Sequence, residues 1–376
     1  MSGVSARNSK ALSIWALVCL LGLGLLAGCA AQIREEAAEE LVWPLPPEVP
    51  RIKYVGELSK PTDVGKEKAA SSRLIEAVLG IRSEDSQILL KPYGVHGDQK
   101  ARVYVADSAT GKVVVFDRHA RDVFVLGKRG LGQLGKAMGV TTGKDGRIYV
   151  ADASGRRVVV YDPEGQFLKA MGGKEVLARP VGVAVDDERG RVYVADTWAH
   201  QVVAFDQEGK VLFRIGKKAE PREVPTGASD HAWNRSSEKG EFRFPTNIAL
   251  DRQGRLYVVD SINFRVQVFD PGGTFLFSFG RLGDGFGEFA RPKGIALDSD
   301  GHIYVVDAAF NNVQIFDPRG RLLLFFGNIG RGRGEFWLPA GIAIDPSDKI
   351  YVVDQYNRRV QIFQYLKQTL AKKGGK

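Results

Sequence analysis

Cysteine is almost absent from this sequence, and its scarcity excludes several kinds of site. Only Cys19 and Cys29 occur among 376 residues, too few for a disulfide framework, a thiolate zinc site or a Cys-x-x-Cys-His haem attachment. Histidine occurs five times, with no His-x-His or His-Glu-x-x-His spacing. The chain also lacks a Gly-x-Ser-x-Gly turn and a Gly-Lys-Ser/Thr phosphate loop. The sequence therefore predicts no catalytic residue, no metal and no cofactor.

The first 28 residues have the composition of an export leader. Arg7 and Lys10 precede the apolar run Ala11–Leu26, which is too short and wrongly flanked for a membrane span. The following Leu26-Ala27-Gly28-Cys29 resembles the bacterial lipobox. That resemblance implies a lipoprotein signal peptide over 1–28, removed so that Cys29 carries palmitate-like acyl chains. An uncleaved anchor helix is the alternative.

Residues 29–50 are predicted to be a tether between the lipid and the globular part. This segment contains Pro44, Pro46, Pro47 and Pro50, which favour an extended backbone. Ala30 rather than Asp follows the lipobox cysteine. By the same resemblance, this implies an outer-membrane anchor facing the periplasm. Residues 367–376 are predicted to be a basic tail.

A repeated unit dominates the rest of the chain. A Tyr-Val-x-Asp core begins at Tyr104, Tyr149, Tyr193, Tyr257, Tyr304 and Tyr351, with spacings of 45, 44, 64, 47 and 47 residues. Each unit has four short β-type runs separated by turn residues, as in Arg255–Gly280 and the run before it. A single four-stranded sheet cannot bury both of its faces, so the copies must stack. A period near ~45 residues with four strands per unit predicts propeller blades.

The repeats resemble the NHL repeat over residues 51–366. They share the pattern P-x-G-[IV]-A-x-D, then YV-x-D, then V-x-[VI]-F-D, and three copies are preceded by Gly-Glu-Phe, for example Gly240-Glu241-Phe242. The resemblance implies an all-β, six-bladed β-propeller. The last unit lacks a fourth apolar run after Phe363, whereas Ile52–Leu58 is a strand without a blade. We therefore expect this N-terminal strand to complete the last blade and close the ring.

The loops between the second and third strands are the predicted binding face, because they gather aromatic, amide and basic side chains on one surface. The candidate binding residues are Trp198, His200, Asn263, Phe264, Phe310, Asn311, Tyr356, Asn357 and Arg358. The lysines Lys112, Lys128, Lys136 and Lys293 are expected on or near the same face. Aromatic residues and arginine are concentrated in protein interfaces. Packing of some of these side chains between blades is the alternative.

Two other sets of residues have competing interpretations. The six aspartates that end the second strands, Asp107 to Asp354, are expected to bind loop backbone rather than a metal. A metal-dependent lyase or hydrolase in the channel remains the alternative function, suggested by His96, His200 and His231 and by Asn247, which replaces a repeat glycine. Some NHL-like propellers hold zinc through histidines in the channel.

The sequence thus predicts a cell-envelope lipoprotein that acts as a non-catalytic protein-binding or assembly platform. Its expected partners are an envelope protein at the loop face and the membrane through Cys29. A structural lipoprotein with no partner at that face is a further possibility. The net charge of +9 fits an acidic partner or an anionic surface. Nucleic acid is not expected, because export removes the chain from it and the positive charge is modest.

Overall fold

The computed structural model describes residues 40–65, 87–218 and 238–367. Several predicted features lie outside the described residues: the leader, Cys29, the part of the tether before residue 40, His231 and the tail from residue 368. The described chain holds no helix long and apolar enough for a membrane crossing.

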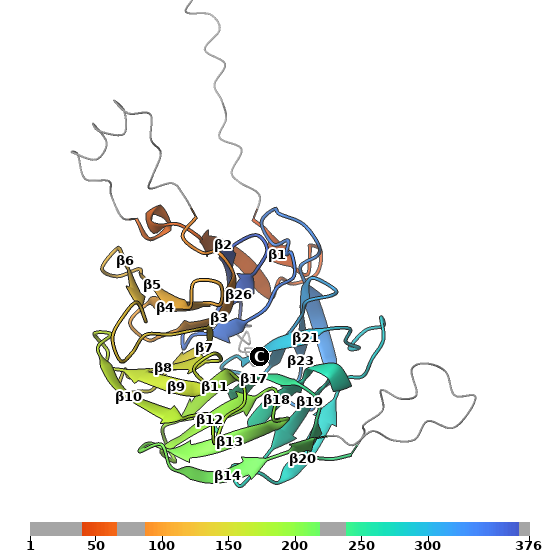
Figure 1. The fold of residues 1–376 in the computed structure, drawn as a ribbon. Coiled ribbons are helices and arrows are strands. Elements are labelled where there is room, and N and C mark those ends of the chain that lie inside the picture. Colours follow the sequence, from red (N-terminus) through yellow and green to blue (C-terminus); the bar gives the residue numbers. More distant parts are fainter. Residues whose placement is uncertain (1–39, 66–86, 219–237, 368–376) are drawn as a thin grey trace, which may run out of the picture. The chain divides into compact units, whose positions relative to one another are not determined.

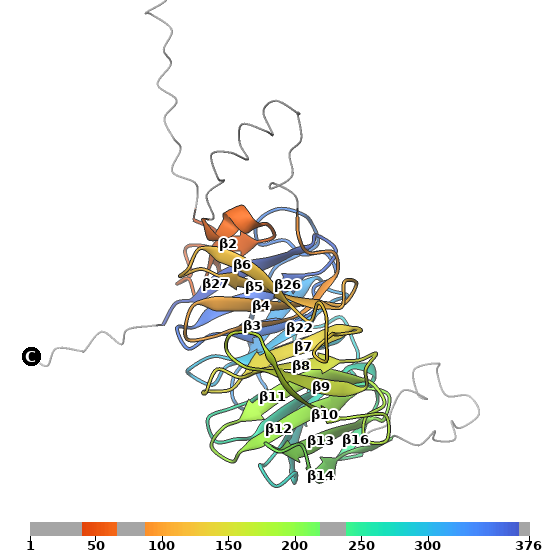
Figure 2. The same cartoon turned by 60° about the vertical axis from the view of Figure 1, so that its left-hand side comes forward.

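Six antiparallel sheets are arranged around a channel, which confirms the predicted all-β propeller (Figure 1, Figure 2). In blades one to five the strands follow chain order from the channel outward, whereas in blade six the N-terminal strands lie outside the C-terminal ones. Blade one is β3 (Pro92–Gly97), β4 (Arg102–Asp107), β5 (Lys112–Asp117) and β6 (Asp122–Leu126). Blade two is β7 (Ala137–Thr142), β8 (Ile148–Asp152), β9 (Arg157–Tyr161) and β10 (Phe167–Gly172). Blade three is β11 (Pro180–Asp186), β12 (Arg191–Asp196), β13 (Gln201–Asp206) and β14 (Val211–Ile215).

The second half of the chain repeats this arrangement. Blade four is β17 (Pro245–Leu250), β18 (Leu256–Asp260), β19 (Arg265–Phe269) and β20 (Phe275–Phe279). Blade five is β21 (Pro292–Leu297), β22 (Ile303–Asp307), β23 (Asn312–Phe316) and β24 (Leu322–Phe326). Blade six is β25 (Ile342–Ile344), β26 (Lys349–Asp354), β27 (Arg359–Tyr365), β2 (Ile52–Leu58) and β1 (Val42–Trp43). A small parallel pair, β15 (Lys217–Lys218) and β16 (Glu241–Phe242), precedes blade four.

The hydrophobic core lies between the blades. Each of the six large apolar clusters combines residues of two neighbouring blades, as where Tyr104 of blade one packs with Val150 of blade two. The second strands are buried on both sides, and the six repeat tyrosines are at most 1% exposed. This arrangement explains why the sequence alternates so little in these strands.

The N-terminal strand closes the ring, as the sequence predicted. β2 pairs antiparallel with β27, from Ile52 opposite Tyr365 to Leu58 opposite Val360. The structure also extends the blade into the expected tether, because β1 pairs with β2. The Trp43 ring lies 5.6 Å from that of Phe326 and 5.7 Å from that of Phe363. The propeller therefore begins about ten residues earlier than the predicted boundary, because an apolar tryptophan within the proline-rich segment packs on the core.

The channel wall depends on close contact between neighbouring blades. A Cβ atom on Gly94 would lie 2.2 Å from the Met138 carbonyl oxygen of the next blade. At the equivalent glycines, Gly139, Gly182, Gly294 and Gly341, a Cβ atom would also lie 2.4 to 2.9 Å from a carbonyl oxygen of the next blade. In blade four this position is Asn247, whose Oδ1 accepts a hydrogen bond from the backbone N–H of Ile248. Asn247 therefore has a local backbone role.

Candidate functional site

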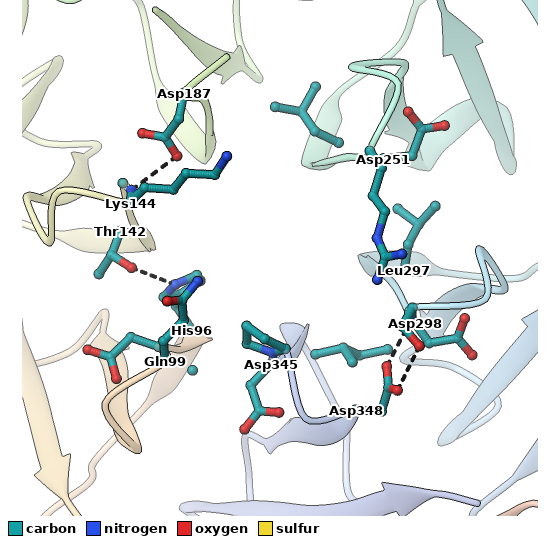
Figure 3. A pocket seen from close by; sticks show the side chains of 18 of the residues that line it. His96, Gln99, Thr142, Lys144, Asp187, Asp251, Leu297, Asp298, Asp345 and Asp348 are labelled. Carbon is teal, nitrogen blue, oxygen red and sulfur yellow. Dashed lines mark hydrogen bonds between the residues drawn. The ribbon is translucent and has the colours of Figure 1, made fainter. Parts of the chain in front are cut away.

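The channel is open at two ends, called mouths here. The innermost strands all begin at one mouth and end at the other. The mouth at the finishing end, called here the turn-side mouth, is a cavity of about 690 Å³ lined by the turns that follow the innermost strands (Figure 3). Its carboxylates are largely engaged in holding those turns. Asp98 accepts bonds from Arg102 at 2.7 Å and Tyr104 at 3.1 Å, and Asp345 accepts one from the Tyr351 hydroxyl at 2.9 Å.

His96 lines the turn-side mouth, where its Nε2 lies 2.9 Å from the Thr142 hydroxyl. Burial lowers the pKa of His96 to about 4, although Asp98 and Asp345 act in the opposite direction. The imidazole is therefore neutral at physiological pH. His200 lies at the other end of the blades, where its Nδ1 accepts a bond from the Phe244 N–H at 3.2 Å. The structure does not bring the two histidines together, so they do not form the joint channel site that was considered as an alternative.

The other end of the channel is a cavity of about 530 Å³, called here the basic mouth. Its wall contains the cationic side chains Lys91, Lys136, Arg179, Arg291 and Lys293. Aromatic residues share the wall: Tyr93, Trp198, Phe244 and Tyr356. Among the residues that the structure describes, no acidic side chain lines it. The charge of this mouth therefore differs from that of the turn-side mouth, whose lining contains both acidic and basic residues.

Lys293 has the most perturbed environment of these cations. Burial lowers the pKa of its ammonium group to about 8, and the positive charges of Arg291 and Lys91 add to the effect. Its Nζ lies over the Tyr93 ring, 5.9 Å from the centroid. Burial in turn raises the pKa of Tyr93 to about 12, so the phenol is neutral. The carboxylate of Asp307 opposes this lowering of the Lys293 pKa but is not among the residues that line the mouth, so the lining itself is positively charged.

Hydrogen bonds between blades hold the rim of the basic mouth. The Thr197 hydroxyl donates to the Pro245 carbonyl at 2.7 Å, and the Ser261 hydroxyl donates to the Pro292 carbonyl at 2.6 Å. The Gln355 amide donates to the Pro92 carbonyl at 3.0 Å and links the last blade to the first. The backbone at the mouth is therefore fixed before any ligand arrives.

Two exposed arginine–aromatic groups flank the basic mouth. The Arg179 guanidinium lies over the Trp198 ring at 4.8 Å, and Trp198 is 54% exposed. Across the mouth, the rings of Trp337 and Tyr356 are 5.8 Å apart and Arg331 lies 5.0 Å from the Trp337 centroid. Tyr356 is 51% exposed. These planar surfaces lie open to solvent on the loop face.

The predicted binding residues separate according to their position after the strand-ending aspartate. The second residue after it is exposed in every blade, and this is the position of Trp198 and Tyr356. The fourth residue has positive φ in every blade, and this is the position of His200, Phe264, Asn311 and Arg358. The repeat thus explains why these side chains share one face, and only part of the set is open to a partner.

Several of the predicted binding residues have structural contacts instead. Phe264 packs against the core between blades four and five, so its ring is not the surface anchor that the sequence suggested. Asn311 is buried and its Oδ1 accepts a bond from the Leu338 N–H. Phe310 is half-buried, whereas Arg358 is exposed. The alternative interpretation, packing between blades, therefore holds for Phe264 and Asn311.

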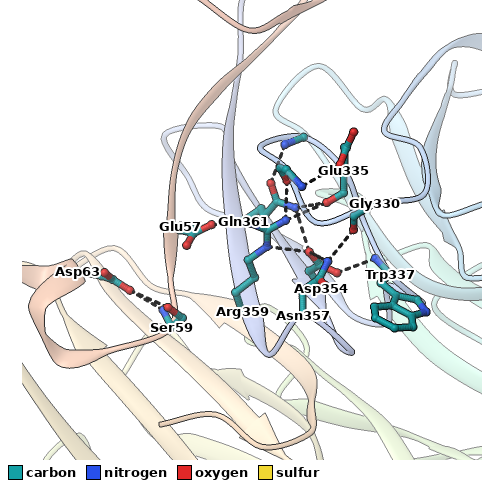
Figure 4. Close-up of polar contacts among 12 residues, drawn as sticks. Glu57, Ser59, Asp63, Gly330, Glu335, Trp337, Asp354, Asn357, Arg359 and Gln361 are labelled. Atoms are coloured by element: carbon teal, nitrogen blue, oxygen red, sulfur yellow. Dashed lines mark hydrogen bonds and ion pairs between the residues drawn. The ribbon is translucent and has the colours of Figure 1, made fainter. Parts of the chain in front are cut away.

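Asn263 and Asn357 support the strand-ending aspartates. Each donates a side-chain hydrogen bond at 2.8 Å, Asn263 to Asp260 and Asn357 to Asp354. Figure 4 shows the cluster in blade six, where Asp354 also accepts bonds from the Trp337 N–H and from Arg359 Nε, both at 2.8 Å. The expectation that these aspartates bind loop backbone is confirmed.

Sequence reasoning did not recognise the basic mouth, although a signal for it exists. In four of six blades the residue directly before the innermost strand is basic: Lys91, Lys136, Arg179 and Arg291. Reading this position across the repeats would have predicted a positive ring at one end of the channel. Among the described residues, no group of three or more His, Cys, Asp or Glu side chains is placed to hold a metal ion.

Comparison with known protein families and solved structures supports the propeller fold. A six-bladed β-propeller family profile matches residues 241–309 and 297–370, and the NHL-repeat profile matches residues 177–205. A search of curated proteins finds no significant match. The chain is similar to a Bacteroides thetaiotaomicron protein of unknown function, with 16% identity and a TM-score of 0.57 over 75% of this chain and 71% of that one.

Two enzymes have similar structures. A gluconolactonase from Xanthomonas campestris is 16% identical, with a TM-score of 0.54 over 74% of this chain and 87% of that one. Virginiamycin B lyase from Staphylococcus aureus is 13% identical, with a TM-score of 0.51 over 73% of this chain and 95% of that one. At these identities the likeness shows the fold alone. The chain is a six-bladed β-propeller in which residues 177–205 match the NHL repeat.

Proposed function

We propose that this protein is a lipid-anchored envelope lipoprotein that serves as a binding platform for another protein. The observation that carries the proposal is the pair of exposed arginine–aromatic groups, Arg179 with Trp198 and Arg331 with Trp337 and Tyr356, on either side of the basic mouth. Tryptophan, tyrosine and arginine dominate the residues that contribute most to protein binding. The rigid rings of tryptophan and tyrosine lose little conformational freedom on contact.

A photocrosslinking amino acid at position 198 or 356 is expected to capture one recurring envelope protein in intact cells. The matched control is position 212, because Leu212 is 44% exposed but lies on β14, the outermost strand of blade three. Crosslinked products are compared by mass spectrometry. Equal capture from positions 198, 356 and 212 would remove the support for a specific surface.

The captured partner then allows a quantitative test. Replacing Trp198, Trp337 and Tyr356 together by alanine is expected to weaken its binding at least ~100-fold, since each such anchor typically contributes ~2 kcal/mol or more. Binding is measured by calorimetry with a Leu212→Ala variant as the control. An unchanged affinity in a folded triple variant contradicts the platform.

The proposed anchor makes a separate prediction. A Cys29→Ala variant is expected to lose all incorporation of labelled palmitate and the mobility change that accompanies leader removal, because Cys29 is the proposed acylation site. Cys19→Ala is the matched control, since Cys19 lies within the proposed leader. Palmitate labelling that persists in Cys29→Ala would exclude this residue as the site.

A further inference from the structure

We infer that the basic mouth is a binding site for a small multivalent oxyanion, a molecule that carries two or more carboxylate or phosphate groups. This goes beyond the proposed platform, because it concerns a small ligand in the channel rather than a protein on the rim. It requires neither a partner nor a lipid anchor. The purified propeller is therefore sufficient to test it.

The charge distribution is the first argument. Five cations line a cavity without a single acidic lining residue. Elsewhere in the structure, half-buried cations are paired: Arg102 lies 2.7 Å from Asp98, and Arg265 lies 3.0 Å from Asp260. Within the described residues, Lys91, Lys136, Arg291 and Lys293 form no ion pair. Lys136 and Lys293 are half-buried, whereas Lys91 and Arg291 are exposed. A concentration of unpaired positive charge in a concave wall focuses the field on one position and attracts anions.

The mutual effect of these cations is the second argument. Burial is the main cause that disfavours the protonated form of Lys293, and the nearby charges of Arg291 and Lys91 disfavour it further, whereas Asp307 favours it. Like charges that repel one another in a partly desolvated wall are unfavourable in the empty protein. An oxyanion among them removes that penalty and gains charge-assisted hydrogen bonds. Several cations around one cavity favour a ligand with several negative charges over a monoanion.

The shape and rigidity of the cavity are the third argument. Its volume of about 530 Å³ lies within the range for small-molecule sites, roughly 300–1,000 Å³. The rim is already fixed by the bonds from Thr197, Ser261 and Gln355 to carbonyls of neighbouring blades. A preorganised site has less conformational freedom to lose on binding. Tyr93 and Trp198 add aromatic surface to the wall beside the charges.

Calorimetry with citrate and pyrophosphate tests the inference. Each probe supplies several oxyanion groups, and the tighter of the two shows whether the site prefers carboxylate or phosphate. We expect Lys293→Gln and Arg291→Gln each to weaken the preferred probe by about tenfold or more. Arg358→Gln is the matched control, because Arg358 is exposed on the same face but does not line the cavity. Thermal unfolding checks that each variant is folded.

Proton linkage separates a direct role of Lys293 from a general charge effect. The charged and titratable groups around this ammonium are Arg291, Lys91, Tyr93 and Asp307. With its pKa lowered to about 8, Lys293 loses its charge above that pH in the free protein. Citrate affinity is therefore expected to fall as the pH rises from about 8, with proton uptake on binding. In Lys293→Arg the affinity stays constant over this range, because arginine remains charged.

The calorimetric results either support or overturn the oxyanion site at the basic mouth. Binding of either probe that weakens in both glutamine variants and becomes independent of pH in Lys293→Arg supports the site. The inference is overturned if neither probe binds at millimolar concentration. It is equally overturned if Arg358→Gln weakens binding as much as Lys293→Gln does, since the anion would then respond only to net charge.

Discussion

An Arg359→Ala variant is expected to lose about 3–5 kcal/mol of unfolding free energy at neutral pH, the usual result of removing one partner from a buried ion pair. Arg359 Nε lies 2.8 Å from Asp354, and the two side chains are 9% and 0% exposed. The same guanidinium reaches Glu57 at 2.8 Å and two backbone carbonyls, those of Gly332 and Glu335. One side chain thus connects β27, the link before blade six and the closing strand β2.

The variant leaves a buried carboxylate without its cation. Asp354 keeps its bonds from the Trp337 N–H, Asn357 and Gln361, but these neutral donors do not balance its charge. Arg157→Ala is the matched control. It removes the equivalent residue of blade two, which is 29% exposed and lies 3.4 Å from Asp152. Because this pair is longer and better hydrated, we expect less than half the loss.

The pH dependence of the deficit has a definite sign. Burial raises the pKa of Asp354 and Arg359 counteracts the rise, so the pKa in the variant lies higher still. In the unfolded chain this carboxyl ionises at its ordinary, lower pKa. The deficit is therefore full at neutral pH and shrinks as the pH falls through the raised pKa of the folded state. Urea unfolding of both variants at several pH values measures it, and a deficit that does not depend on pH contradicts the role assigned to Asp354.

Removing the closing strand is expected to have a still larger effect. A chain that begins at Pro61 lacks β1 and β2, whereas a chain that begins at Glu40 keeps every contact described above and is the reference. Ile52 and Leu58 are at most 1% exposed. The loss of each large buried side chain costs about 2–5 kcal/mol. We expect the shorter chain to lose more than about 5 kcal/mol, most of the stability of an ordinary domain.

The missing strand also leaves an open edge. Without β2, the backbone of β27 has no partner along its outer side, from Val360 to Tyr365, and Phe363 loses its contacts with Trp43 and Tyr54. Exposed edges promote association. Circular dichroism, urea unfolding and sedimentation compare the two chains. A soluble chain from Pro61 that unfolds at the same urea concentration as the reference would show that closure contributes little.

The fold was predictable because every blade repeats one sequence pattern. The closing strand was predictable because the last repeat visibly lacks its fourth strand. The predicted bounds of the closing strand, Ile52–Leu58, agree with those of β2. Trp43 was missed because the proline-rich composition around it favours an extended tether, and only the tertiary contact with Phe326 and Phe363 overrides that preference.

The candidate site was less predictable than the fold, for a physical reason. Lys91 and Lys293 are about 200 residues apart in the sequence, and only the closed ring brings both to one cavity. Conversely, Phe264 and Asn311 share a face with Trp198 in the repeat but point into packed or hydrogen-bonded positions. Position within the repeat predicts the face of a residue, whereas exposure also depends on the backbone of the turn.

Closure by the two ends of the propeller has a consequence for how the molecule is made. Glu57 and Arg359 are 302 residues apart, so the strand that is synthesised first meets its partner last. At typical rates of about 5–20 residues per second, this interval is on the order of 15–60 s. Until β27 is available, Ile52 and Leu58 have no blade to pack against, and the blades already formed are an open stack. The vulnerable period for this protein is therefore its biosynthesis, when a chaperone that shields one short apolar strand would have the greatest effect.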